Sequence, residues 1–179
     1  AKRCMVNAQL MAMEFHGMLP VHDRPEATEG YEGFSHLCAM QGEVELATLE
    51  YIIRDHDRAS FEARKALFES AAAFLNAKYG AGTVEVALRD SYYNMREKIE
   101  PHMAIVEAAQ QAMRDAGVTP RVVPIRGGTD GARLSYEGLP CPNLFTGGEN
   151  YHGRFEYVPV EDMEAAVRTL KCILRNAAK

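Results

Sequence analysis

Three kinds of feature are missing from this sequence. Its apolar runs fall short of the ~20 residues that a membrane-spanning helix needs, so we expect no membrane segment. Its lysines and arginines are scattered, and a net charge of −5 with a pI near 5.7 argues against a nucleic-acid-binding surface. Its four cysteines contain no CxxC pair, which excludes the usual metal-knuckle and redox patterns. We therefore expect reduced structural thiols in a cytoplasmic protein.

What remains is the composition of an ordinary globular protein. The chain has 179 residues, of which 47% are hydrophobic and 25% are charged, enough for one large domain or two small ones. It has no internal repeat, no low-complexity segment and no long flexible linker. Its secondary-structure signals fall into two blocks, which divide near residue 97.

The first block has the pattern of helix, hairpin, helix and strand. Apolar periodicity predicts a helix over 5–19, and the β-rich segments 33–44 and 47–57 are close enough to require a hairpin. A second apolar stripe at helical spacing starts at Ser60 and ends at Gly80. Residues 83–88 alternate in the manner of a strand. These elements predict a two-layer α/β domain with one layer of helices and one of strands.

The second block alternates helices with short strands. Pro101 suits the first turn of a helix that runs to about residue 116. The sequence predicts short strands at 121–125 and 143–145 and helices at 130–136 and 160–177. Such alternation indicates part of a parallel sheet, with ligand-binding loops at the carboxyl ends of its strands. The fold class is therefore α/β in both blocks.

The most informative stretch is residues 124–156, PIRGGTDGARLSYEGLPCPNLFTGGENYHGRFE, which holds two glycine-rich turns. In the first turn, RGGTDG at 126–131, glycines permit a tight bend and a close approach of substrate. Thr129 or Asp130 can cap the helix that follows. The interval has the composition of half an active site.

One arginine and one histidine in this stretch are candidate functional residues. Arg126 is a planar cation suited to binding a carboxylate, although an arginine at a strand end is usually a salt-bridge partner or solvated. His152 follows the second glycine turn and could ligate a metal, although a lone loop histidine is more often hydrogen-bonded or exposed.

A second concentration of metal-type residues is the run Arg54, Asp55, His56 and Asp57. Side chains alternate along a strand, which puts Arg54 and His56 on one face and Asp55 and Asp57 on the other. We interpret the run as a solvated strand end.

Residues 124–156 strongly resemble the C-terminal part of the peptidase T family, the tripeptide aminopeptidases of the co-catalytic zinc aminopeptidase and carboxypeptidase superfamily. Three upstream segments resemble the same family in the same order. They are TEGYEGF at 28–34, YIIRD at 51–55 and DSYYNMREK at 90–98. The resemblance therefore covers essentially the whole chain.

The resemblance also implies what the chain does not contain. Members of that family are longer and take their other zinc ligands and their glutamate base from an N-terminal half. The sequence has no His-x-Asp, no Asp-Asp-Lys-x-Gly and no Glu-Glu pair. We therefore assign no catalytic residue and expect no complete two-zinc site in these 179 residues.

By the same resemblance, residues 1–97 form most of a lid domain of the dimerisation type. Its first strand would lie before Ala1, so the sheet would lack one strand and expose an edge. Residues 98–179 form the C-terminal lobe of the catalytic domain. The expected partners are a tripeptide substrate, the N-terminal half and, through the lid, a second copy of the chain.

The resemblance assigns roles to four residues. His152 ligates one of the two zinc ions. Arg126, together with the lid arginine Arg54, binds the terminal carboxylate of the substrate. Asn94 is a weaker substrate-binding candidate, because an asparagine there also suits an ordinary turn.

Three functions stay open on the sequence. The chain is the C-terminal portion of a zinc tripeptide aminopeptidase that is inactive by itself, or a non-catalytic binding and self-association module derived from one. As a third reading, the turn at 126–131 binds phosphate. The third lacks a Walker lysine and a GxGxxG after the strand, and is the weakest.

Overall fold

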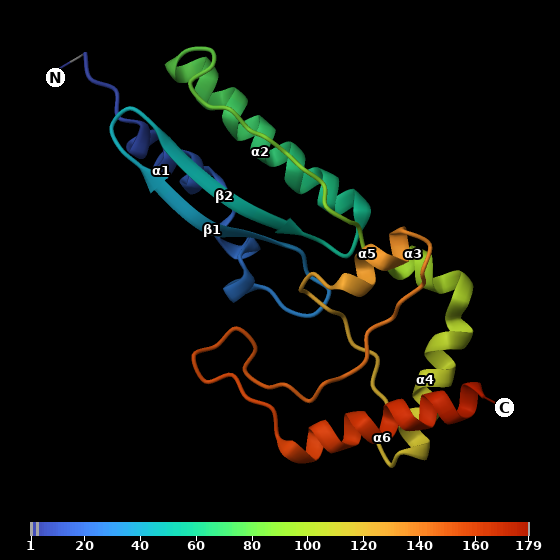
Figure 1. The fold of residues 1–179 in the computed structure, drawn as a ribbon. Coiled ribbons are helices and arrows are strands. Elements are labelled where there is room, and N and C mark those ends of the chain that lie inside the picture. The colour runs from blue at the N-terminus through green and yellow to red at the C-terminus, as the bar shows by residue number, and fades with distance from the viewer. Residues whose placement is uncertain (1, 3, 179) are drawn as a thin grey trace. The chain divides into compact units, whose positions relative to one another are not determined.

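The computed structural model describes residue 2 and residues 4–178. The chain forms two compact units, Ala1–Tyr93 and Asn94–Lys179, and each is described by itself (Figure 1). The sequence placed the division after residue 97 instead of after Tyr93. The assignment of the units to a lid and a catalytic lobe stays a prediction. None of the described helices is long and apolar enough to cross a membrane.

The first unit is built on an antiparallel hairpin (Figure 1). Strand β1 (Phe34–Gly42) pairs with β2 (Ala47–Arg54), with Phe34 opposite Arg54 at the open end. The register shifts once, between Leu37 and Ala39. The hairpin predicted from the sequence is confirmed, although β2 ends at Arg54 and not at residue 57.

Two helices, α1 (Ala8–Met18) and α2 (Arg58–Tyr79), share a core with this hairpin. The alternate residues Leu49, Tyr51 and Ile53 of β2 pack against that core, as strand alternation requires. The buried side chains that form the core come from α1, from the residue that directly follows it, and from α2. They are Phe15, Leu19, Phe68, Ala71, Ala72 and Leu75. The helices and the hairpin therefore form two layers.

Side-chain caps decide where the two helices begin. The side chain of Asn7 accepts a hydrogen bond from the Gln9 amide at 2.9 Å, so α1 starts at Ala8 and not at residue 5. Asp57 accepts from the Ser60 amide at 2.8 Å, so α2 starts before Ser60. The amide of Ser60 also holds the pKa of the Asp57 carboxyl below its usual range. Gly80 ends α2 at φ 121°, as predicted.

Residues 83–88 form no ladder with any described residue, and residues 83 and 84 lie in a bend. Val84 and Val86 pack against the core, so the alternation was read correctly. The strand predicted at 83–88 is wrong for the described residues. The side chain of Asn76, instead of a neighbouring strand, binds the backbone of Val84. Its Oδ1 accepts from the Val84 amide at 2.9 Å, and its Nδ2 donates to the Val84 carbonyl at 2.8 Å.

A cavity of about 720 Å³ borders this segment. Its lining includes alternate residues of β2, residues 82–90, and the aromatic side chains Phe15 and Phe68. Within the described residues, β2 pairs with β1 alone. Apolar side chains therefore form part of the cavity wall, and the cavity lies beside β2, which has one strand partner among the described residues.

The second unit contains a packed pair of long helices, α4 (Met103–Asp115) and α6 (Val160–Ala177) (Figure 1). Ala112 and Thr169 are almost completely buried, at 0% and 1% exposure. The side chain of Asn176 donates to Asp115 Oδ2 at 2.9 Å, which joins the ends of the two helices. The helix predicted at 160–177 is confirmed.

Helical structure in this unit begins earlier than Pro101. Short helix α3 (Arg96–Ile99) leads into a 3₁₀ turn, η3 (Glu100–His102), and α4 follows. Pro101 lies in the first turn of η3, where its missing N–H costs no hydrogen bond. Gly117, at φ 78°, follows α4 as predicted.

The two strands predicted at 121–125 and 143–145 are wrong for the described residues, in which neither segment joins a ladder. An extended segment becomes a strand only beside another backbone edge. The apolar residues of the first segment are instead open to solvent, with Val122 and Val123 exposed by 71% and 59%. The parallel sheet expected from the sequence therefore does not form within the described part of this unit.

The core of the first unit yields a stability prediction. Leu75 is completely buried, whereas its neighbour Phe74 is 56% exposed. We expect Leu75→Ala to lower the free energy of unfolding by about 2–5 kcal/mol, because it removes buried methyl groups and leaves a cavity. Phe74→Ala should cost about 1 kcal/mol or less. Urea unfolding followed by circular dichroism would compare them, and equal losses would contradict this description of the core.

Candidate functional site

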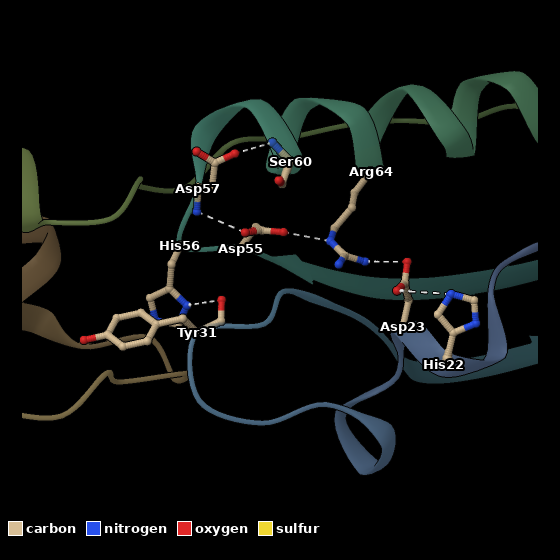
Figure 2. Close-up of polar contacts among 8 residues, drawn as sticks. All are labelled: His22, Asp23, Tyr31, Asp55, His56, Asp57, Ser60 and Arg64. Carbon is tan, nitrogen blue, oxygen red and sulfur yellow. Dashed lines mark hydrogen bonds and ion pairs between the residues drawn. The ribbon is translucent and has the colours of Figure 1, made fainter.

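The end of β2 is fixed by the carboxylate of Asp55, as Figure 2 shows. Asp55 follows Arg54, and its side chain is only 6% exposed. Its Oδ2 accepts from Arg64 Nε of α2 at 2.9 Å, and its Oδ1 accepts from the Asp57 amide at 3.0 Å. A Cβ on Gly33 would lie 2.0 Å from Oδ2, so only glycine fits there. Arg54 therefore extends from a firmly held strand end.

Arg64 also binds the segment between α1 and β1 (Figure 2). That segment contains two 3₁₀ turns, η1 (Val21–Asp23) and η2 (Pro25–Ala27). The second arm of the Arg64 guanidinium pairs with Asp23 at 2.6 Å. One arginine thus joins α2, the end of β2 and η1.

The rest of the charged run serves local structure. His56 Nδ1 donates to the Tyr31 carbonyl at 3.2 Å, and the two rings meet edge to face at 5.2 Å. Asp57 caps α2. Because β2 ends at Arg54, the alternation argument does not extend to these residues, and that step of the sequence analysis was wrong.

The glycine turn leads into helix α5 (Asp130–Tyr136), which was predicted with these bounds. Thr129 is the cap: its Oγ1 accepts from the Ala132 amide and from Asn143 Nδ2, both at 3.2 Å. Asp130 is the first helical residue, where a carboxylate interacts favourably with the helix dipole. Of the two caps proposed from the sequence, the structure selects the threonine.

The close approach that the third glycine permits is used within the chain. A Cβ on Gly131 would lie 2.5 Å from the Cys141 carbonyl oxygen. Buried Ser135 donates to the Gly131 carbonyl at 2.7 Å and accepts from the Cys141 amide at 3.0 Å. These contacts hold residues 141–143 against α5. Arg126, which precedes the turn, is half-buried, and its Nε is shielded from solvent.

Asn94 has a structural role at the start of the second unit. Its Oδ1 accepts from the Arg96 amide at 3.0 Å, which shapes the turn into α3. Its carbonyl accepts from the Tyr136 hydroxyl at 3.0 Å, and the Lys98 ammonium lies 5.1 Å from the centre of that ring. The ordinary turn considered from the sequence is thus present, and the substrate-binding role stays a prediction.

His152 lies in a closed loop whose ends are joined by backbone hydrogen bonds. Glu149 and Tyr157 exchange both bonds, at 2.9 and 3.2 Å. Asn150 and His152 adopt φ of 58° and 59°, a region that residues with a Cβ seldom occupy. The His152 amide donates to Glu156 Oε2 at 3.0 Å. The histidine is exposed on a backbone whose turn is closely specified.

These residues do not fit a zinc ion by themselves. A stable zinc site needs three or four ligands. Among the residues that the structure describes, no three His, Cys, Asp or Glu side chains come together in a way that could hold a metal. Within that part of the chain, His152 does not have the two or three companion side chains that a zinc site needs.

The four predicted site residues lie on separate segments. Arg54 ends β2 in the first unit. In the second unit, Asn94 precedes α3, Arg126 precedes the glycine turn and His152 lies in the loop 149–157. The charged links made by Arg64 were not predicted, because its partners lie far away in the sequence and carry no local motif.

Comparison with known proteins defines the class to which this arrangement belongs. The sequence model of peptidase family M20/M25/M40 matches residues 8–176, and the chain belongs to this family.

Three relatives that match the chain over its full length are each named peptidase T. The chain is 59% identical to the peptidase T of Shouchella clausii, 55% to that of Exiguobacterium sibiricum and 54% to that of Alkaliphilus oremlandii. Each match covers 100% of this chain and 44% of the relative. The chain thus spans less than half the length of these proteins.

The single-ligand geometry predicts weak zinc binding. One imidazole supplies a fraction of the binding free energy of a closed site. We expect the purified chain, loaded with zinc and dialysed, to retain well under one zinc per molecule. His152→Ala should not alter that content. One tightly held zinc per chain that the mutation removes, measured by atomic absorption, would contradict the half-site description.

Proposed function

We propose that this chain forms the C-terminal portion of a zinc-dependent tripeptide aminopeptidase, which releases the N-terminal residue of tripeptides. The observation that carries the proposal is the identity of more than half of all residues, over the whole chain, with proteins called peptidase T. In this proposal the chain supplies substrate-binding residues and one metal ligand, and the remaining catalytic residues come from elsewhere.

The proposed role of His152 rests on its loop and its chemistry. Neutral imidazole suits zinc, and the loop holds the histidine at the surface of its unit, where ligands from another part of the protein can reach it. A two-zinc centre supplies Lewis acidity and an activated water when it is bound. Glu149 and Glu156 are near His152 in sequence, but Glu149 pairs with Tyr157 through its backbone, the Glu156 carboxylate accepts from the His152 amide, and neither receives a role as base.

The proposed role of Arg126 and Arg54 is to bind the substrate carboxylate. A guanidinium can hold both oxygens of a carboxylate in a fixed plane, and such a pair is stronger than a neutral hydrogen bond. Arg54 is well suited because Asp55 and its partners hold its strand end. Asn94, whose Oδ1 accepts from the Arg96 amide, is the third and weaker candidate.

The cavity beside β2 supports the proposal that the lid lacks one strand. It is bordered by β2 and by residues 82–90, and apolar side chains form part of its wall. An extended strand placed there would bury apolar side chains and satisfy backbone groups on both sides. We propose that the N-terminal part of the longer enzyme supplies this strand.

A second candidate function is a non-catalytic module that associates with itself or with a partner. The specific observation in its favour is the amount of exposed apolar side chain, for example Leu10 at 64% and Met13 at 60% on α1. Such surfaces mark association sites in folded proteins. Restoration of peptidase activity by a second polypeptide distinguishes the two functions.

The first functional prediction concerns activity. Alone, the chain should hydrolyse no tripeptide, because the proposed base and the other zinc ligands belong to another part of the enzyme. Mixed with zinc and a separately made N-terminal portion of a peptidase T, it should gain activity. His152→Ala should abolish that gain, whereas His102→Ala should not. Zinc-dependent cleavage by the chain alone would overturn the proposal.

The second functional prediction concerns the substrate carboxylate. In the assembled enzyme, Arg126→Ala should lower kcat/KM for a tripeptide by roughly ten- to a hundredfold, matching about 1.5–3 kcal/mol for a charge-assisted pair. The corresponding tripeptide amide should change little. Arg121→Ala, an exposed arginine on the same segment, is the control. Equal losses with acid and amide would remove Arg126 from the carboxylate site.

A further inference from the structure

A histidine in the first unit connects three elements that are distant in sequence. His16, on α1, places Nδ1 2.7 Å from the Tyr51 hydroxyl of β2. Its Nε2 lies 3.0 Å from Arg24 Nη2, and Arg24 lies between η1 and η2. The imidazole and the Tyr51 ring are stacked, with centroids 6.1 Å apart. This contact fastens the segment 20–33 to the helix and the hairpin.

The partners fix the protonation state of the imidazole. A guanidinium carries only donors, so His16 Nε2 must accept from Arg24. The single proton of the neutral ring is therefore on Nδ1, which donates to the Tyr51 oxygen. An imidazolium has a hydrogen on both nitrogens. Protonation of His16 would thus break the Arg24 hydrogen bond and bring two cations face to face.

The charged groups around His16 do not compensate for a second positive charge. Tyr51 stays neutral, because burial raises its pKa to about 12. On α1 itself, Glu14 is bound to Lys78. On α2, the guanidinium of Arg64 reaches Asp23 of the same segment. The carboxylates of Asp23 and Asp55 are both already paired with Arg64.

We propose that His16 is a pH-sensitive latch, which helps to hold the segment 20–33 in place while its imidazole is neutral and loosens the segment around Arg24 on protonation, whereas the Arg64–Asp23 pair remains. The segment ends beside the proposed substrate-binding arginine. Tyr31 accepts from His56, and Phe34 pairs with Arg54. Release of the latch loosens one border of that strand end. The latch itself is independent of the proposed function.

The direction of the pH effect follows from the environment of His16. Burial, followed by the charge of Arg24, lowers the pKa of this histidine. The folded state therefore favours the neutral ring, and the unfolded or released segment binds the proton more readily. The contribution of the latch is complete above the ordinary histidine pKa. It is lost as the pH falls through the lowered pKa of the folded state.

Hydrogen exchange of the 179-residue chain tests the latch. Protection factors of residues 20–33, corrected for intrinsic exchange, should fall at least several-fold between about pH 7.5 and about pH 5. His16→Gln is the critical variant, because its amide can accept from Arg24 and donate to Tyr51 without titrating. In this variant the segment should stay protected at both pH values.

Two further variants separate the latch from other effects. Arg24→Gln removes the cation, so the NMR titration midpoint of His16 should rise. His22→Gln removes the histidine that lies within this segment, whose Nε2 is 3.9 Å from Asp23 Oδ1, and should leave the pH dependence unchanged. A fall in protection that persists in His16→Gln would overturn the latch. So would a wild-type His16 that titrates at or above the ordinary histidine value.

Discussion

The backbone ladder between β1 and β2 is the contact on which the first unit depends. Each strand satisfies its polar groups along one edge, which lets alternate residues of β2 turn inward against α1 and α2. The buried cluster around Leu75 then holds both helices on that hairpin. The same need for a paired edge governs the remaining extended segments. The backbone of Val84 binds the Asn76 amide in place of a strand, and residues 121–125 expose their apolar side chains.

The site residues depend on a second set of contacts, in which the chain holds its own loops. Asp55 is fixed by Arg64 and by the absence of a side chain on Gly33, and this fixes the end of the strand that carries Arg54. In the second unit, Ser135 and Gly131 hold residues 141–143 against the helix that follows the first glycine-rich turn. The paired ends of the loop 149–157 hold the backbone that carries His152. Arg54 and His152 thus extend from backbone that local contacts hold, although no three metal-ligand side chains come together among the described residues.

Local patterns were enough to predict the hairpin and the helices at 130–136 and 160–177. Their turns, caps and apolar stripes are encoded within a few residues. The three unpaired strands could not be predicted correctly, because a strand is defined by a neighbour and not by its own alternation. Thr129 and Asp130 were equally good caps by sequence, and only the hydrogen-bond geometry decided between them.

The candidate site likewise contains residues that a sequence pattern singles out and contacts that no local pattern predicts. Recognition of a family pattern singled out His152, Arg126, Arg54 and Asn94, and the membership of the family is confirmed. Their roles stay predictions. The link between His16 and Tyr51 was not foreseen, because 35 residues separate them and neither belongs to a motif. Likewise, nothing in the sequence near Arg64 indicates that it binds both Asp23 and Asp55.

We propose that His152 binds zinc together with ligands from another part of a longer peptidase. The most direct measurement is anomalous diffraction at the zinc edge from crystals of this chain in complex with the N-terminal portion of a peptidase T. We expect a zinc ion bonded to the imidazole of His152, with its remaining ligands from the N-terminal portion. A fully ligated zinc site that excludes His152 would contradict it.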